Sequence, residues 1–156
     1  MKVRIHQCRH KGWFVPLSWL IRLVQKTKYS HYAIEFNSLA GNTMIVDATH
    51  CTVKSQTLQR FVEHYKIIKT FEVEVQYPRD MVCRWFEHYY GTPYATAQLV
   101  GIVIKNKKLG WADKKMTCNE LILRFLNRFT NAMITGVDTL DLNQTEAEIL
   151  KIGKEL

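Results

Sequence analysis

The stretch MTCNELILRFL, residues 116–126, places a cysteine where an amphipathic helix is expected to begin. Thr117 and Glu120 stand three residues apart directly before an apolar run, which is the capping-box pattern of a helix N-terminus. The apolar residues that follow are spaced to share one face of that helix: Leu121, Leu123, Phe125, Leu126 and Phe129. The stretch therefore predicts a buried helix whose first residue is Cys118.

A cysteine at a helix start has two explanations. Most buried cysteines are inert packing residues. At the first helical position, however, the thiol of Cys118 would lie in the positive end of the helix dipole, beside amides that lack a helical partner, and this field stabilises a thiolate. The same amides can hold an oxyanion that forms on an attacked carbonyl. Cys118 is therefore a candidate nucleophile that still needs a base.

Six histidines are candidates for that base. His64 and His88 fall in predicted helices next to aromatic residues, which favours a structural role. His6 and His10 lie near the N-terminus, which we expect to be mobile. His31 differs because it opens the predicted strand HYAIEF, and a strand presents a side chain from a rigid position. A cysteine nucleophile needs such a base within reach, so His31 is the preferred partner.

The strand that follows supplies a group to orient the histidine. HYAIEF, the loop NSLAGN and the segment TMIVDA at 43–48 predict an antiparallel hairpin. If Phe36 pairs with Asn42, His31 faces Asp47 directly, and side chains in such a pair lie within reach of each other. A slip of one residue would put them on opposite faces of the sheet. The pattern thus predicts a His31–Asp47 pair.

Other groups remain open for the third position. Glu35 shares a strand face with His31 but lies roughly 13 Å along the strand, too far for a direct hydrogen bond. On spacing alone, a strand-end carboxylate in solvent explains Asp47 equally well. Glu35 and His50 therefore stay as alternatives to Asp47.

The remaining segments predict one α+β domain, residues 1–156, with an antiparallel sheet packed against helices. PLSWLIRLVQKTK reads as a helix that begins at Pro16. Ser55 is expected to cap a helix that buries Leu58, Phe61, Val62 and Tyr65. Strict alternation at 70–76 predicts a strand, and 80–90 a helix that Gly91 ends. Residues 95–105 fit either a helix or a strand, with helix favoured for the first half, and the C-terminal tail predicts a loop and a short helix.

The composition limits the class of protein. Of the 156 residues, 47% are hydrophobic and 23% charged, which argues against disorder. The net charge of +8 allows an acidic partner such as nucleic acid or an anionic membrane surface, but the basic residues are scattered, which favours a role in solubility. The four cysteines form no C-x-x-C pair, so we expect no metal or other cofactor. They could form two disulfides, but a chain of this size does not need them, so we expect reduced thiols and a cytoplasmic protein. The longest apolar run, 13–21, is too short to span a membrane and lacks the features of a signal peptide.

Four motifs resemble, in order, those of the permuted NlpC/P60 branch of papain-like cysteine hydrolases. They are Tyr29-Ser30-His31 at a strand start, Asp47-Ala48 on the next strand, the Gly91 to Tyr94 segment, and Cys118-Asn119-Glu120-Leu121 at a helix start. Asn119 stands where the family usually has serine, and Asp47 where it often has glutamate. The resemblance covers about residues 16–126.

The resemblance implies a circularly permuted papain-like fold in which Cys118 is the nucleophile, His31 the base and Asp47 the third, polar residue. It implies hydrolysis of an amide, ester or thioester bond through an acyl-enzyme, with a peptide or other acyl compound as substrate. Tyr29 and Tyr94 are candidates to line the cleft. Two alternatives remain: acyl transfer on lipids by the same dyad, which needs an apolar groove or a membrane-facing patch, and a non-catalytic basic binding module.

Overall fold

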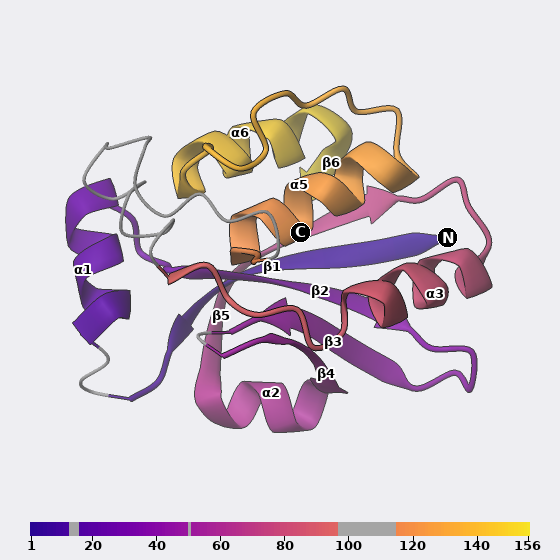
Figure 1. Cartoon of the computed structure of the whole chain (residues 1–156), viewed down its shortest axis with the longest axis horizontal. Helices are drawn as coiled ribbons and strands as arrows, with labels where there is room; N and C mark the ends of the chain where they lie inside the picture. Colours follow the sequence, from indigo (N-terminus) through magenta and orange to yellow (C-terminus); the bar gives the residue numbers. More distant parts are fainter. Residues whose placement is uncertain (13–15, 50, 97–114) are drawn as a thin grey trace.

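The structure, a computed structural model, describes residues 1–12, 16–49, 51–96 and 115–156. These residues form an α+β fold with a six-stranded antiparallel sheet in the order β4-β3-β2-β1-β5-β6 (Figure 1). The strands are β1 Lys2–His10, β2 His31–Asn37, β3 Thr43–Ala48, β4 Val53–Thr57, β5 Tyr65–Glu74 and β6 Gly153–Glu155. The helices are α1 Pro16–Gln25, α2 Leu58–His64, α3 Arg79–Tyr89, α5 Cys118–Phe129 and α6 Leu142–Ile152.

Both faces of the sheet are covered by helices. In Figure 1, α5 and α6 lie above the sheet and α2 lies below it. The larger core lies on the α5 side, where Phe71 and Val73 of β5 alternate toward the helices as the strict alternation at 70–76 predicts. The smaller core lies between the sheet and α2 and consists of Cys8, Ala33, Ile45 and Phe61. Among the described residues, no helix has the length and apolar character needed to cross a membrane.

Helix α5 confirms the prediction from its sequence. Thr117 is the N-cap, and its side chain accepts a hydrogen bond from the Glu120 amide at 3.2 Å. The other half of the capping box does not form: Oε1 of Glu120 instead accepts a hydrogen bond from Arg124 one turn later, at 2.9 Å. The whole predicted apolar stripe is buried, and Ile122 is buried with it. Burial of this stripe against the sheet fixes the position of Cys118.

Two expectations about local structure are wrong. The N-terminal segment is not mobile: it forms β1, which lies between β2 and β5. Its buried polar residues hide the strand pattern, because His6 and Gln7 are both buried but hydrogen-bonded to partners on other strands. Ser55 is not a helix cap either: it lies in β4, and Thr57 caps α2 by accepting from the Arg60 amide at 3.3 Å.

Most of the remaining predictions about helices and strands are confirmed. Helix α1 begins at Pro16, α3 precedes Gly91 as expected, and the tail forms α6. Strand β5 begins at Tyr65, five residues before the predicted start. Beyond Thr96, the prediction for 95–105 lies outside the described residues.

The β2–β3 hairpin forms as predicted but with a different register. Ala33, not His31, is the partner of Asp47, and Asn37 pairs with Thr43. The predicted register is wrong by two residues because the five-residue turn spans 38–42 and not 37–41, with Gly41 at φ 81°. A shift of two keeps every side chain on its face of the sheet, so His31 and Asp47 remain diagonal neighbours.

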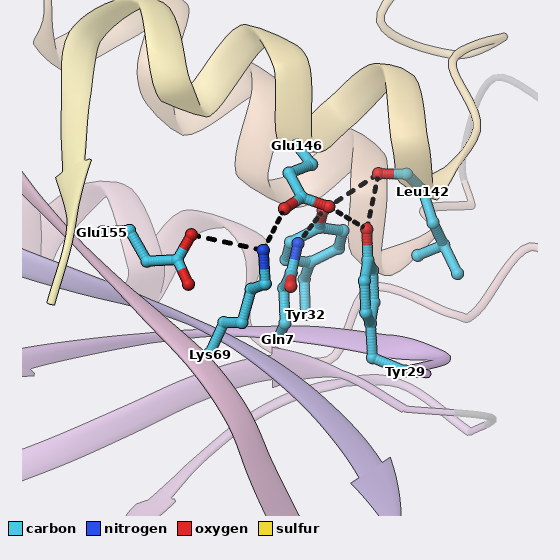
Figure 2. A network of polar contacts seen from close by, with 7 residues as sticks. All are labelled: Gln7, Tyr29, Tyr32, Lys69, Leu142, Glu146 and Glu155. Carbon is cyan, nitrogen blue, oxygen red and sulfur yellow. Dashed lines mark hydrogen bonds and ion pairs between the residues drawn. The ribbon is translucent and has the colours of Figure 1, made fainter. Parts of the chain in front are cut away.

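Polar contacts fasten α6 to the sheet beneath it. Figure 2 shows Tyr29, Tyr32 and Lys69 reaching up from the sheet side to this helix. The Tyr32 hydroxyl donates to the backbone oxygen of Leu142 at 3.0 Å. Glu146 accepts from the Tyr29 hydroxyl at 2.6 Å and pairs with Lys69 at 2.9 Å. Glu146 therefore links α6 both to the segment before β2 and to β5.

Replacing Glu146 by glutamine is expected to lower the free energy of unfolding by about 1–2 kcal/mol at about pH 7. Burial raises the pKa of Glu146, but the hydrogen bonds from Tyr29 and Lys69 outweigh it and hold the pKa below 4.5. The stabilisation is therefore present above pH 4.5 and is lost as the pH falls through the lower folded value. Urea unfolding at neutral and acidic pH measures this difference.

Glu148→Gln is the matched control for that experiment. Glu148 lies on the same helix but pairs with the exposed Lys151, three residues away, and such surface pairs contribute about 0.2–0.5 kcal/mol. Equal losses in the two variants, or a loss in Glu146→Gln that persists in acid, would contradict the assigned role of Glu146.

Candidate active site

Cys118 lies where three parts of the chain converge. It is the first residue of α5, and only 1% of its surface is exposed. The side chain of His31 and the backbone N–H of Tyr32, both at the start of β2, lie close enough to the thiol to lower its pKa. The hydroxyl of Tyr94 donates to Sγ at 3.9 Å. The helix start thus sets the sulfur against a histidine and two further hydrogen-bond donors.

His31 is held between the thiol and a carboxylate. As the first residue of β2, it directs its ring Nε2 to Asp47 Oδ2 at 3.1 Å. With Nε2 bonded in this way, Nδ1 is the ring nitrogen left for the interaction with Cys118 that raises the pKa of His31. The ring stacks on Tyr65 with a centroid distance of 5.0 Å and an interplanar angle of 24°, which restricts its rotation. The structure therefore brings together the predicted nucleophile, base and orienting residue.

Asp47 is fully buried, so the alternative of a strand-end carboxylate in solvent is wrong. One carboxylate oxygen, Oδ2, bonds to His31, and the other, Oδ1, accepts from Gln56 Nε2 at 3.3 Å. A buried carboxylate needs such partners because its transfer out of water is costly. Gln56 on β4 therefore fixes the carboxylate that in turn fixes the imidazole.

The pKa shifts of Cys118 and His31 favour the same charge state. Burial raises the pKa of the Cys118 thiol, but the hydrogen bond and positive charge of His31, helped by Tyr32 and Tyr94, bring it below its ordinary value. Burial lowers the pKa of His31, but the contacts with Asp47 and Cys118 outweigh it and raise this pKa to about 9. Both shifts favour a thiolate beside an imidazolium at neutral pH.

Groups suited to an oxyanion lie at the same sulfur. The backbone amide of Cys118 opens a helix, and the first amides of a helix have no partner within it. The Tyr94 hydroxyl is a second donor next to Sγ. Asn119 lies beside them, but its Nδ2 already donates to the backbone oxygen of Leu140 at 3.1 Å. Its Oδ1 lies 3.5 Å from Sγ and accepts a hydrogen bond from the thiol only while the thiol is protonated.

The other predicted candidates lie elsewhere or outside the described residues. Glu35 accepts from His6 Nε2 at 2.9 Å and from Arg4 at 3.1 Å, so it orients a different histidine. Tyr29 gives its hydroxyl to α6, and its role in substrate binding stays a prediction (Figure 2). His50 is outside the described residues.

Two site residues were missed in the sequence. Gln56 lies in a segment that carries no strand pattern, because the buried residues of β4, Val53 and Gln56, are three apart and do not alternate. The sequence pattern predicts Tyr65 on the buried face of a helix, whereas Tyr65 opens β5 and its ring stacks between those of Phe61 and His31. The apolar spacing of 58, 61, 62 and 65 explains that error, because it continues past the end of α2.

No group of three or more histidine, cysteine or acidic side chains that could hold a metal is found among the residues that the structure describes. The chain matches no protein-family model, and no curated protein matches it.

Replacing Asp47 by asparagine is expected to lower the pKa of His31 from about 9 toward 6.5, because the negative charge that stabilises the imidazolium is removed. In the native protein this stabilisation is fully present below pH 6.5 and is lost as the pH rises through about 9. NMR titration of the histidine ring protons measures the change. Glu35→Gln, which removes the carboxylate beside His6, is the control, and an unchanged His31 titration in Asp47→Asn would contradict the assignment.

Proposed function

We propose that the protein is a cysteine hydrolase of the amidase or peptidase type that cleaves an acyl bond through a Cys118 acyl-enzyme. The observation that supports this most strongly is the buried Cys118–His31–Asp47 chain at the start of α5. A nucleophile hydrogen-bonded to a base, with the base held by a third group, is the arrangement that nucleophilic catalysis needs.

The chemistry follows from the positions of these groups. The Cys118 thiolate attacks the substrate carbonyl, and a carbon–sulfur bond forms while the carbonyl electrons move onto oxygen. The Cys118 amide and the Tyr94 hydroxyl stabilise that oxyanion. His31 donates its Nδ1 proton to the leaving group as the scissile bond breaks. Water then attacks the thioester with His31 as base, which releases the acid and restores the ion pair.

The same features support membership of the permuted NlpC/P60 branch of papain-like hydrolases. In this chain the histidine strand precedes the cysteine helix, and that helix packs on an antiparallel sheet. The four ordered motifs meet at one place: His31 and Asp47 contact each other, and Tyr94 contacts Cys118. A permuted papain-like fold is our proposal for this arrangement.

Hydrolysis of 4-nitrophenyl acetate, an activated ester, tests the proposal without knowledge of the natural substrate. Cys118→Ala is expected to lower kcat by at least about a thousandfold, because the nucleophile acts as a unit with its base. Cys51→Ala is the matched control, since the Cys51 side chain is exposed. Its backbone oxygen, which alanine keeps, accepts a hydrogen bond from the Tyr94 amide. Circular dichroism checks that both variants are folded. Hydrolysis that survives in Cys118→Ala would overturn the proposal.

A further inference from the structure

A pocket lies between α3 and the C-terminal end of α5. It has a volume of about 430 Å³, within the usual range for small-molecule sites. Arg128 of this pocket stands ten residues after Cys118, about 15 Å along the helix, so the pocket is separate from the candidate active site. Two helices supply its lining: Met81, Arg84 and Trp85 from α3, and Arg128 and Phe129 from α5.

Helix periodicity and aromatic contacts fix these side chains at one place. Met81, Arg84 and Trp85 are spaced three and four residues apart, so they share one face of α3. The half-buried indole of Trp85 contacts α5, with ring centroids 5.7 Å from Phe125 and 5.8 Å from Phe129. The indole therefore forms a wall of the pocket that both helices hold in position.

The indole of Trp85 offers a flat surface for stacking. Its four aromatic neighbours, two on α3 and two on α5, meet it at interplanar angles between 55° and 81°. In the part of the chain that the structure describes, no ring therefore stacks in parallel on this indole. A planar ring in the pocket would find an offset-stacked position on it, an arrangement that aromatic pairs favour.

Two guanidinium groups and no carboxylate belong to the lining. Arg84 is exposed and pairs with Asp80 one turn earlier on the same helix. Arg128 is exposed, lies over the ring of Tyr77 at 6.0 Å from its centroid, and has no carboxylate partner among the described residues. A guanidinium presents several N–H donors in one plane, which suits the oxygens of a phosphate. The pocket thus combines a stacking surface with a positive rim.

We infer that this pocket binds a nucleotide, with the base stacked on Trp85 and the phosphate between Arg84 and Arg128. A small inorganic anion would leave the apolar surfaces of Trp85 and Phe129 in contact with water. An apolar ligand would cover the guanidinium groups without giving them an acceptor, which is costly. A ligand with a flat ring at one end and a phosphate at the other satisfies both parts of the lining. The net charge of +8 favours the approach of such an anion.

Calorimetry with parts of a nucleotide tests the inference on the native chain. Adenosine 5′-monophosphate is expected to bind at least about tenfold more tightly than either ribose 5-phosphate, which lacks the base, or adenosine, which lacks the phosphate. The assigned indole N–H signal of Trp85 is expected to shift in the NMR spectrum on binding. Ribose 5-phosphate that binds as tightly as the nucleotide, or an unchanged Trp85 signal, would overturn the inference.

Arg128→Gln locates the phosphate. It is expected to raise the Kd of adenosine 5′-monophosphate about tenfold or more, because charge-assisted hydrogen bonds are lost. Arg60→Gln is the matched control: Arg60 is exposed on α2, on the other side of the sheet, and the net charge changes equally (Figure 1). Equal weakening in the two variants would show a general attraction of anions and would overturn the site.

A single-stranded DNA of about eight nucleotides identifies the source of the nucleotide. Tighter binding of this strand than of adenosine 5′-monophosphate, weakened by Arg128→Gln but not by Arg60→Gln, would support the site with a nucleic-acid strand as its ligand. Binding of the mononucleotide with equal or greater affinity would support a free nucleotide. Binding of neither would overturn the inference.

Discussion

The buried carboxylate of Asp47 is the constraint on which the candidate site depends. With no exposed surface, it must be satisfied inside the protein, and it has two partners, His31 and Gln56. These partners lie on the strands that flank β3, so the pairing of β2, β3 and β4 is tied to the orientation of the imidazole. The electrostatics of the site are therefore set by the same register that builds the sheet.

The thiol of Cys118 is subject to opposing effects. Its burial opposes ionisation, and a cysteine buried this deeply without partners would be an inert packing residue. The start of α5 changes this, because it brings the sulfur to the imidazolium that Asp47 stabilises. The contrast with Cys8 is informative. Cys8 pairs with His31 across the strands, yet burial, with smaller contributions from Asp47 and Cys118, raises its thiol pKa.

The sequence predicts the elements that carry the reacting groups because their signals are local. The cap at Thr117 and the apolar stripe place Cys118, and the alternation of HYAIEF places His31. The contact between His31 and Asp47 is found, but through a wrong register, and it survives because an even shift preserves the face. Strand β1 and the partner Gln56 are not found, since buried polar residues matched by distant partners leave no hydrophobic pattern.

The pH dependence of Cys118 alkylation by iodoacetamide tests the central claim, that His31 holds this thiol ionised, most directly. Peptide mapping by mass spectrometry gives the rate at Cys118 separately from the other cysteines. We expect an inflection below about pH 8.5, the ordinary thiol value, and an upward move of that inflection in His31→Ala. An inflection at the ordinary value in the native protein, or one that His31→Ala leaves in place, would contradict it.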